Sequence, residues 1–361
     1  MKNKKLNKFT LTNIKCYGMV LIAFAIMYPL QSAGIISNSI RGQLVPICTY
    51  IVMAISLNLT VGFLGELSLG HAGFMSIGAF SGVITAASLQ NSISSGPVIL
   101  LVSIIVGGIA AGIAGLLIGI PVIRLRGDYL AIVTLAFGEI IKNIINCVYV
   151  GIDGGGIHAS MTSADALNMA ADGKLVLNGP QGAVGITKLA TFGSGVLLIL
   201  FTLFIVLNLI NSKTGRAVTA IRDNRIAAES VGIGITKYKL TAFIISAVIA
   251  GMAGALYAMN FSTIAAKKFD FNTSILILVF VVLGGMGNIP GTIIATTLLY
   301  MLPELLRQFA DYRMLLYAIV LILVMLATNS EKVKVFTERV KGMFSRRKDV
   351  LSDGEGGASN G

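Results

Sequence analysis

Glu139 and Lys142 are the side chains whose type and position most suggest a chemical role, because both lie in an otherwise apolar segment. A carboxylate and an ammonium could contact the two charges of a small zwitterion. An ionisable group inside a membrane is costly unless it is paired, and i, i+3 spacing on a helix lets two residues pair with each other. The pair is therefore a polar point on a solute path or an ion pair that locks packing, and the packing interpretation is preferred.

The other residues that could do chemistry are few and scattered. The two histidines, His71 and His158, are too far apart in sequence to suggest a histidine zinc site. Cys16, Cys48 and Cys147 are widely spaced, and we expect buried packing thiols, not disulfides or metal ligands. The chain has no Walker A loop, nucleophile elbow, zinc-protease or haem motif, and no potassium-channel filter. We expect no catalytic residue, metal or cofactor on this chain.

The composition indicates which elements must position these residues. Of 361 residues, 55% are hydrophobic and 12% are charged, and the mean hydropathy is +0.85. Soluble domains carry about 25% charged residues. The values exclude a soluble enzyme, a disordered chain and a DNA-binding domain. Because the apolar runs are roughly 20 residues long, they predict transmembrane helices and not barrel strands.

Ten hydrophobic segments predict an all-α, polytopic transmembrane helix bundle of about ten spans. The pair around Pro290 could instead form a re-entrant hairpin, because its centre is rich in glycine. The segments are 16–36, 44–64, 69–90, 97–120, 128–150, 191–210, 240–260, 273–289, 291–309 and 313–329.

The net charge of +12 could reflect nucleic-acid binding or basic cytoplasmic loops, and the position of the charges decides between them. If the N-terminus is cytoplasmic, 20 of the 28 Lys and Arg residues fall in cytoplasmic segments. By the positive-inside rule, this distribution predicts an N-in, C-in topology without a nucleic-acid partner.

The predicted organisation has a membrane domain, 16–329, between two basic cytoplasmic ends, 1–15 and 330–361. The N-terminal apolar stretch is long and lacks a clear cleavage site, so we interpret it as an uncleaved first helix and not a signal peptide. The longest predicted external loop is 151–190, and its middle, Ser160 to Lys174, could form a short helix at the outer surface.

The C-terminal tail has two open interpretations. Apolar residues in 331–344 recur every three or four positions among basic ones, which suits an amphipathic helix on the inner leaflet or a solvated basic tail. The last residues, 352–361, are rich in Gly, Ser and Asp and are predicted to be disordered.

The cytoplasmic loop 211–239 predicts a short helix from Thr214 to Val231, ended by Gly232 and Gly234. Small residues keep this helix thin and charged residues give it polar contacts, so it could dock in a groove of another protein or be a solvated connector. The candidate contact residues are Gly215, Arg216, Arg222, Asp223, Asn224, Ala227, Ala228, Glu229 and Gly232.

Two segments are rich in glycine, which permits tight turns and close helix contacts. We interpret both segments as structural turns. Glu66, Ser68 and His71 lie beside the first turn, where we expect one side to be solvated. The glycines are Gly62, Gly65, Gly70 and Gly73 in the first segment, and Gly284, Gly285, Gly287 and Gly291 in the second.

Four motif segments together resemble the permease subunits of branched-chain amino-acid ABC importers, and the second resembles the M-type permease in particular. They occur in the family's order, and the resemblance covers about 40–330. The segments are N-L-T-V-G-F-L-G-E-L-S-L-G-H-A-G-F (58–74), G-D-Y-L-A-I-V-T-L-A-F-G-E-I-I (127–141), T-G-R-A-V-T-A-I-R-D-N-R-I-A-A-E-S-V-G-I (214–233) and V-L-G-G-M-G-N-I-P-G-T (282–292).

The resemblance implies a type II-like importer permease in the bacterial plasma membrane. It implies a second homologous permease, two cytoplasmic ATPases that carry the ATP, and an extracytoplasmic substrate-binding protein. Segment 214–233 is similar to the element that docks on the ATPase. The chain departs from the family in its external loop, where a compact T-G-G-P-x-G pattern is split between Asp153–Ile157 and Asn178–Gly182.

Three alternatives remain at this point. A related permease could carry urea or another small solute, and competition between leucine and urea would separate the two. An ATP-independent secondary transporter or channel would show midplane acids in several helices, of which only Glu139 is an example. A membrane enzyme is disfavoured because no convincing nucleophile–base or metal cluster is present.

Overall fold

The computed structural model describes residues 8–34, 37–90, 93–125, 127–154, 156–169, 173–308, 312, 315–316 and 318–322. The chain forms two compact units, Met1–Met301 and Leu302–Gly361, and the sites below lie in the first. Our predictions for 1–7, for most of segment 313–329 and for the tail 330–361, including its amphipathic and disordered parts, lie outside the described residues.

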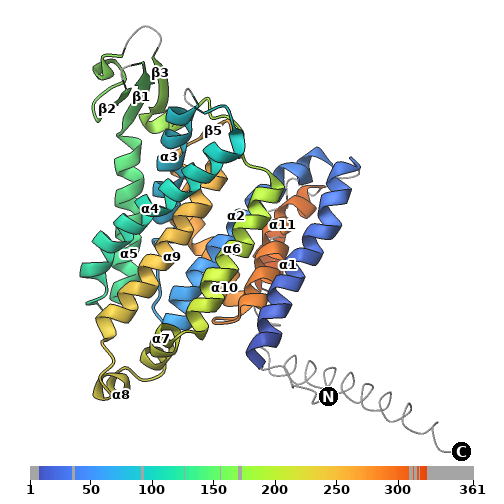
Figure 1. Ribbon diagram of the computed structural model, residues 1–361, viewed down its shortest axis with the longest axis vertical. Helices are drawn as coiled ribbons and strands as arrows, with labels where there is room; N and C mark the ends of the chain where they lie inside the picture. Colours follow the sequence, from blue (N-terminus) through green and yellow to red (C-terminus); the bar gives the residue numbers. More distant parts are fainter. Residues whose placement is uncertain are drawn as a thin grey trace, which may run out of the picture. The chain divides into compact units, whose positions relative to one another are not determined.

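Helices make up most of the described chain (Figure 1). Six of them are long and apolar enough to cross a membrane, namely α1, α2 with its extension to Leu64, α3, α4, α6 and α9. The helices are α1 (Lys8–Ser32), α2 (Asn38–Asn58), α3 (His71–Leu89), α4 (Gly96–Val122), α5 (Asp128–Asn146), α6 (Phe192–Asn211), α7 (Lys213–Asp223), α8 (Arg225–Ser230), α9 (Ile235–Ala258), α10 (Phe271–Gly284) and α11 (Ile289–Leu305).

The helices agree with nine of the ten predicted apolar segments, and the count of ten spans stays a prediction. α10 has 14 residues and α11 has 17. At 1.5 Å per residue, α10 is about 21 Å long, which is shorter than a hydrocarbon core of about 30 Å. α10 alone is therefore too short to cross such a core.

Close packing of small residues holds α3, α4 and α9 together. A Cβ atom on Gly78 of α3 would lie 2.0 Å from the carbonyl oxygen of Gly251 on α9, and one on Gly254 would lie 1.9 Å from that of Met75. Such contacts bring helix backbones together where lipid supplies no hydrophobic driving force. The helix α2 is buried along most of its length, from Leu44 to Asn58.

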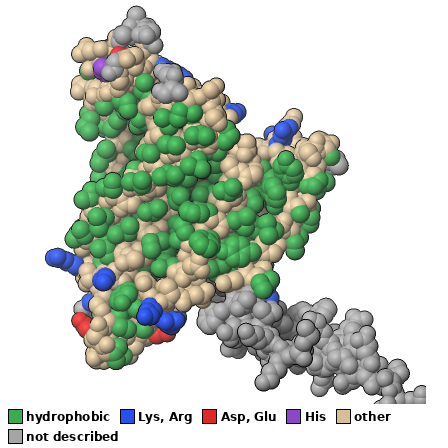
Figure 2. Space-filling view, in the orientation of Figure 1, with side chains coloured by type: hydrophobic (Ala, Val, Ile, Leu, Met, Phe, Trp, Pro, Cys, Tyr) green, Lys and Arg blue, Asp and Glu red, His purple; other side chains and the backbone are tan. Residues whose placement is uncertain are grey.

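Large apolar side chains cover the outer faces of the bundle. Leu117 on α4 and Leu197 on α6 are 67% and 69% exposed, which would be unfavourable in water. Hydrophobic side chains cover the middle of the visible face, and charged ones gather towards its two ends (Figure 2). This arrangement is expected of a surface that faces lipid between two aqueous layers.

The predicted external loop is a β-sheet, so our prediction of a helix from Ser160 to Lys174 is wrong. Only a short 3₁₀ turn, Asp165–Leu167, lies within the described part of that range. The antiparallel sheet has the order β2-β1-β3-β4-β5, and it lies at the opposite end of the bundle from α7 and α8 (Figure 1). Its strands are β1 (Tyr149–Asp153), β2 (Gly156–Ser160), β3 (Lys174–Asn178), β4 (Ala183–Val184) and β5 (Thr263–Ile264).

Two features explain this difference. Short runs such as Y-V-G-I-D and K-L-V-L-N are typical of strands, and a carboxylate oxygen of Asp153 accepts a hydrogen bond from the Gly156 amide to close the first hairpin. The last strand, β5, comes from beyond α9 and could not be anticipated from the loop alone. The expectation of three buried thiols is also wrong, because Cys147 is exposed where α5 ends.

Candidate functional site

The 211–239 loop contains two helices instead of the predicted single helix from Thr214 to Val231. The break falls at Asn224, whose backbone is extended at φ −155° and ψ 106°. Its side-chain oxygen accepts a hydrogen bond from the Ala227 amide at 3.0 Å and so caps α8. An asparagine side chain that bonds its own backbone competes with a continuous helix. Gly232 follows α8 at φ +83°, and Gly234 is the N-cap of α9.

One face of this loop packs on the chain itself. Val218 of α7 lies in a small cluster with Leu64 and Ala242, and Ala228 of α8 packs with Ile221 and Ile235. Ala228 is only 4% exposed.

Among the predicted contact residues, Gly215 and Ala228 therefore face the chain and cannot contact a partner directly. Gly215 has no room for a side chain, because a Cβ atom there would lie 2.2 Å from the carbonyl oxygen of Ile210.

The opposite face of the loop is exposed and carries two apolar side chains that sequence reasoning missed. Ile226 is 81% exposed and Val231 is 74% exposed. Large apolar side chains that are exposed among polar ones can anchor protein–protein contacts. The sequence does carry a sign of this exposed apolar pair, because Ile226 and Val231 are β-branched residues among the polar residues of the motif. The predicted contact residues that are exposed are Arg216, Arg222, Asp223, Asn224, Ala227, Glu229 and Gly232.

Arg222 connects the loop to the first glycine segment. Its Nη1 donates to the carbonyl oxygen of Gly62 at 2.9 Å, and its Nε and Nη2 donate to Asp223 Oδ1 at 3.0 and 2.9 Å. Its aliphatic stem covers Gly65, which has φ +77°, and a Cβ atom on Gly65 would lie 2.6 Å from Arg222 Cγ. The arginine therefore ties α7 to the end of the buried helix α2.

Beyond α2 the chain continues as a π-helix, η1 (Leu59–Leu64), which contacts the turn between α10 and α11. Asn58 is fully buried; its Nδ2 donates to Thr292 Oγ1, and its Oδ1 accepts from the Gly287 amide, both at 2.8 Å. A Cβ atom on Gly62 would lie 1.9 Å from Asn58 Oδ1 and 2.2 Å from the Gly287 nitrogen. Sequence reasoning did not identify Asn58 as a functional candidate, although a lone amide in an apolar run is a usable signal.

The second glycine segment makes the tight turn that this contact requires. Gly285 and Gly287 have φ of +90° and +78°, which side chains disfavour. A Cβ atom on Gly284 would lie 2.5 Å from Thr292 Cα, and one on Gly291 would lie 2.0 Å from the Gly284 oxygen. The start of α11 therefore crosses the end of α10 at backbone contact.

The remaining glycines of the first segment pack on α5. A Cβ atom on Gly70 would lie 2.0 Å from the Thr134 oxygen, and one on Gly73 would lie 2.9 Å from Gly138 Cα. The Leu69 amide donates to Thr134 Oγ1 at 3.1 Å. The first motif segment therefore contacts each of the other three, and we call this region the junction, made of 58–74, 134–138, 215–228 and 284–292.

We expected Glu66, Ser68 and His71 to be solvated on one side, and this is wrong for Ser68 and His71. Ser68 and His71 are each 1% exposed. His71 Nε2 and Ser56 Oγ hydrogen-bond at 2.7 Å, and Ser56 Oγ donates to the Ser246 carbonyl at 2.7 Å. These bonds tie α3, α2 and α9 together inside the bundle.

The ion-pair partner of Glu66 could not be identified from the sequence, which placed Lys239 only among the basic residues of the 211–239 loop. Glu66 forms an ion pair with Lys239 of α9, whose side chain is 5% exposed. This pair connects the first glycine segment to α9.

Glu139 and Lys142 form an ion pair on α5, with side chains that are 33% and 18% exposed. They lie outside the junction, and whether they contact a solute stays a prediction. No group of three His, Cys, Asp or Glu residues that could hold a metal occurs among the described residues.

Comparison with known proteins identifies relatives of this chain. Residues 39–326 match the family described as branched-chain amino acid transport system / permease component. The high-affinity branched-chain amino acid transport system permease proteins LivM of Salmonella typhimurium and Escherichia coli are each 34% identical over 326 residues, which cover 86% of this chain and 73% of theirs.

A probable branched-chain amino acid transport permease protein LivM of Methanocaldococcus jannaschii is 26% identical over 292 residues. That alignment covers 73% of this chain and 79% of the relative. No solved structure matches the chain.

Proposed function

Because the chain belongs to the branched-chain amino acid transport permease family, we propose that it is the membrane-spanning permease subunit of an ATP-driven importer of branched-chain amino acids. The single observation that carries the proposal is the match over residues 39–326. The chain is a multi-pass membrane protein of a transporter family, which is not an enzyme class, and we assign it no catalytic residue. It would supply half of the translocation path.

The proposed topology places both termini in the cytoplasm, with ten spans between them. The excess of Lys and Arg in 1–15, 211–239 and 330–361 supports this orientation. It puts α7 and α8 in the cytoplasm and the β-sheet on the outer face. The same orientation places the 285–288 turn near the cytoplasmic end of the bundle, where Arg222 lies.

The proposed partners follow from these two faces. Two cytoplasmic ATPases would bind ATP and contact the exposed face of α7 and α8, with Ile226 and Val231 as apolar anchors. A second, homologous permease would complete the path. An extracytoplasmic substrate-binding protein would deliver the amino acid to the sheet end, and this chain itself would need no cofactor.

The junction offers a physical route for coupling. A movement of α7 would be transmitted by Arg222 to Gly62, and through Asn58 to the turn at Gly287. Both links run through a side chain, that of Arg222 or Asn58, and each ends on a backbone atom of a glycine, so a shift of α7 would reach η1 and the turn between α10 and α11. ATP binding on the partners would bias the inward-open and outward-open states through this connection.

Uptake of radiolabelled leucine tests the proposal. Cells that lack this gene should lose the uptake, and the intact gene should restore it. Excess isoleucine or valine should compete, and excess urea should not. Competition by urea without competition by branched-chain amino acids would contradict the proposed substrate.

A further inference from the structure

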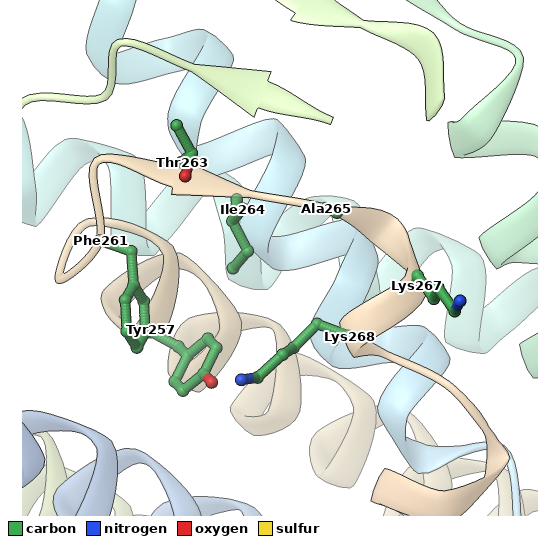
Figure 3. Close-up of a pocket in the computed structure, with 7 residues that line it drawn as sticks. All are labelled: Tyr257, Phe261, Thr263, Ile264, Ala265, Lys267 and Lys268. Atoms are coloured by element: carbon green, nitrogen blue, oxygen red, sulfur yellow. The ribbon is translucent and has the colours of Figure 1, made fainter. Parts of the chain in front are cut away.

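A pocket of about 370 Å³ opens at the sheet end, between the end of α9 and the segment that carries β5 and the 3₁₀ turn Ala266–Lys268 (Figure 3). Its walls include Tyr257 and Phe261 on one side, and Lys267 and Lys268 on the other. The volume falls within the range of small-molecule sites, roughly 300–1,000 Å³. The pocket shares no lining residue with the junction.

The charge in this pocket is positive. None of its lining residues is acidic, and neither lysine makes an ion pair with a described carboxylate. The nearest acid in sequence, Asp270, instead accepts from the Thr273 amide at 3.0 Å and from Asn272 Nδ2 at 2.9 Å, which caps α10. Two ammonium groups beside a concave surface attract an anion and repel a cation.

The opposite wall is apolar and aromatic. The rings of Tyr257 and Phe261 lie 5.0 Å apart, and Ile264 is 5% exposed. In Figure 3 the side chain of Lys268 extends towards the ring of Tyr257, whereas that of Lys267 extends the other way. A ligand that touches Lys268 would therefore rest its remaining atoms on these apolar surfaces.

We propose that this pocket receives the free substrate amino acid at the outer mouth of the permease, with the carboxylate on Lys268 and the branched side chain against Tyr257 and Phe261. The chemical class is a small monocarboxylate with an aliphatic body, and naming it as a branched-chain amino acid rests on the proposed function. A charge-assisted hydrogen bond supplies the selection for the carboxylate. The exposed position makes the site weak, so that the amino acid can leave it.

Protection of a cysteine from labelling tests the site directly. The full-length Thr263→Cys protein places a thiol on the pocket wall. A Cys147→Ser background removes the exposed native thiol, and the other two, Cys16 and Cys48, are buried and should not be labelled. Leucine and 4-methylpentanoate should slow labelling by a membrane-impermeant maleimide. Leucinamide, which lacks the carboxylate, should not. Should Thr263→Cys fail to insert, Ala265→Cys on the same wall replaces it.

A matched pair of charge removals locates the contact. Lys268→Gln should raise the leucine concentration needed for protection about tenfold, as expected when one charge-assisted hydrogen bond is lost. Lys188→Gln removes the same charge near the sheet but outside the pocket, and should leave protection unchanged. Equal protection by leucinamide, or an unchanged Lys268→Gln protein, would overturn the proposal.

Leucine uptake by the complete transporter separates this inference from the proposed function. Uptake without any protection at Thr263→Cys overturns the pocket and leaves the function standing. Protection by 4-methylpentanoate that depends on Lys268, in a transporter that carries no leucine, supports the carboxylate site and contradicts the function.

Discussion

The junction and the pocket beside β5 both have basic side chains, but these side chains have different partners. At the junction, Lys239 is buried in an ion pair with Glu66, and Arg222 uses its donors on Gly62 and Asp223. In the pocket, Lys267 and Lys268 are exposed and make no ion pair with a described acid. A buried, paired cation is occupied by its partner, and removing one of the two leaves an uncompensated charge, whereas a cation without such a partner remains available to a ligand.

The two regions also differ in how tightly they are packed. A Cβ atom on Gly62, Gly70 or Gly284 would meet backbone atoms of another helix or turn. The pocket instead leaves about 370 Å³ open beside β5. Close packing leaves the junction little room to deform locally, whereas the separated walls of the pocket leave space for a ligand.

The largest expected loss of stability follows from removing the buried cation of Lys239. Lys239→Met leaves the Glu66 carboxylate without its partner, so we expect the free energy of unfolding to fall by about 3–5 kcal/mol. Thermal unfolding of the purified protein in detergent would measure this. Lys237→Met, on the exposed side of the same helix, is the control and should change little. If the two variants are equally stable, Lys239 contributes no more to the fold than the exposed Lys237 does.

A methyl group at the junction should be the next most damaging change. Gly62→Ala would place a Cβ atom against Asn58 Oδ1 and the Gly287 nitrogen, so we expect overpacking to cost about 1–3 kcal/mol. Leucine uptake and thermal stability should both fall. Gly234→Ala is the matched control, because a Cβ atom on Gly234 would meet no other atom within 4 Å and its φ is −71°. Equal behaviour of the two variants would show that the junction can relax.

The exposed face of the loop should affect partner binding but not folding. Ile226→Asp puts a charge in the expected apolar contact, and we expect roughly a tenfold or greater loss of ATPase recovery on co-purification. Ala227→Leu should overpack the same contact, whereas Ala228→Leu should destabilise this chain first, because Ala228 is buried in it.

Unchanged ATPase recovery with Ile226→Asp and Ala227→Leu, together with normal leucine uptake, would make α7 and α8 a simple connector. Membrane insertion should be normal in both variants, which serves as the control for folding.

A smaller effect is expected at the ion pair on α5. Glu139→Gln should lower the free energy of unfolding by about 1 kcal/mol or less, because both side chains are partly exposed. Exchanging Glu139 and Lys142 should restore most of that stability. If the exchanged protein is stable and its partner ATPase is active but transport is lost, the pair contacts the solute and the packing interpretation is wrong.

The smallest effect on stability is expected in the pocket. Lys268→Gln removes an exposed charge that has no ion-pair partner among the described residues, so the thermal unfolding curve should not shift measurably. The same measurement on Lys239→Met provides the contrast. A clear loss of stability with Lys268→Gln would show that this lysine also holds the fold together.

Much of the helical framework could be predicted from the sequence. Apolar runs of about 20 residues predicted nine of the helices, because a hydrophobic stretch is a local property. The glycine segments also predicted tight turns, since Gly285 and Gly287 adopt the positive φ that favours glycine. The motif segments identified the family before any fold was known, and residues 39–326 match it.

The sequence analysis predicted neither the sheet nor the break at Asn224, for two physical reasons. The last pairing of the sheet, between Thr263 of β5 and Val184 of β4, joins positions far apart along the chain, so no local pattern in 151–190 could contain that pairing. At Asn224 the helical propensity of the surrounding residues was outweighed by one side-chain hydrogen bond to the Ala227 amide.

The sequence by itself determined the class of protein, the apolar helices and most of the residues that make up the junction. Only the tertiary structure decided which residues meet: Arg222 reaches Gly62 across 160 positions, Lys239 reaches Glu66 across 173, and Asn58 reaches Gly287 across 229. Hydropathy and glycine content depend on neighbours along the chain. Hydrogen bonds and ion pairs between distant segments depend on helix register and crossing, which those local patterns do not specify.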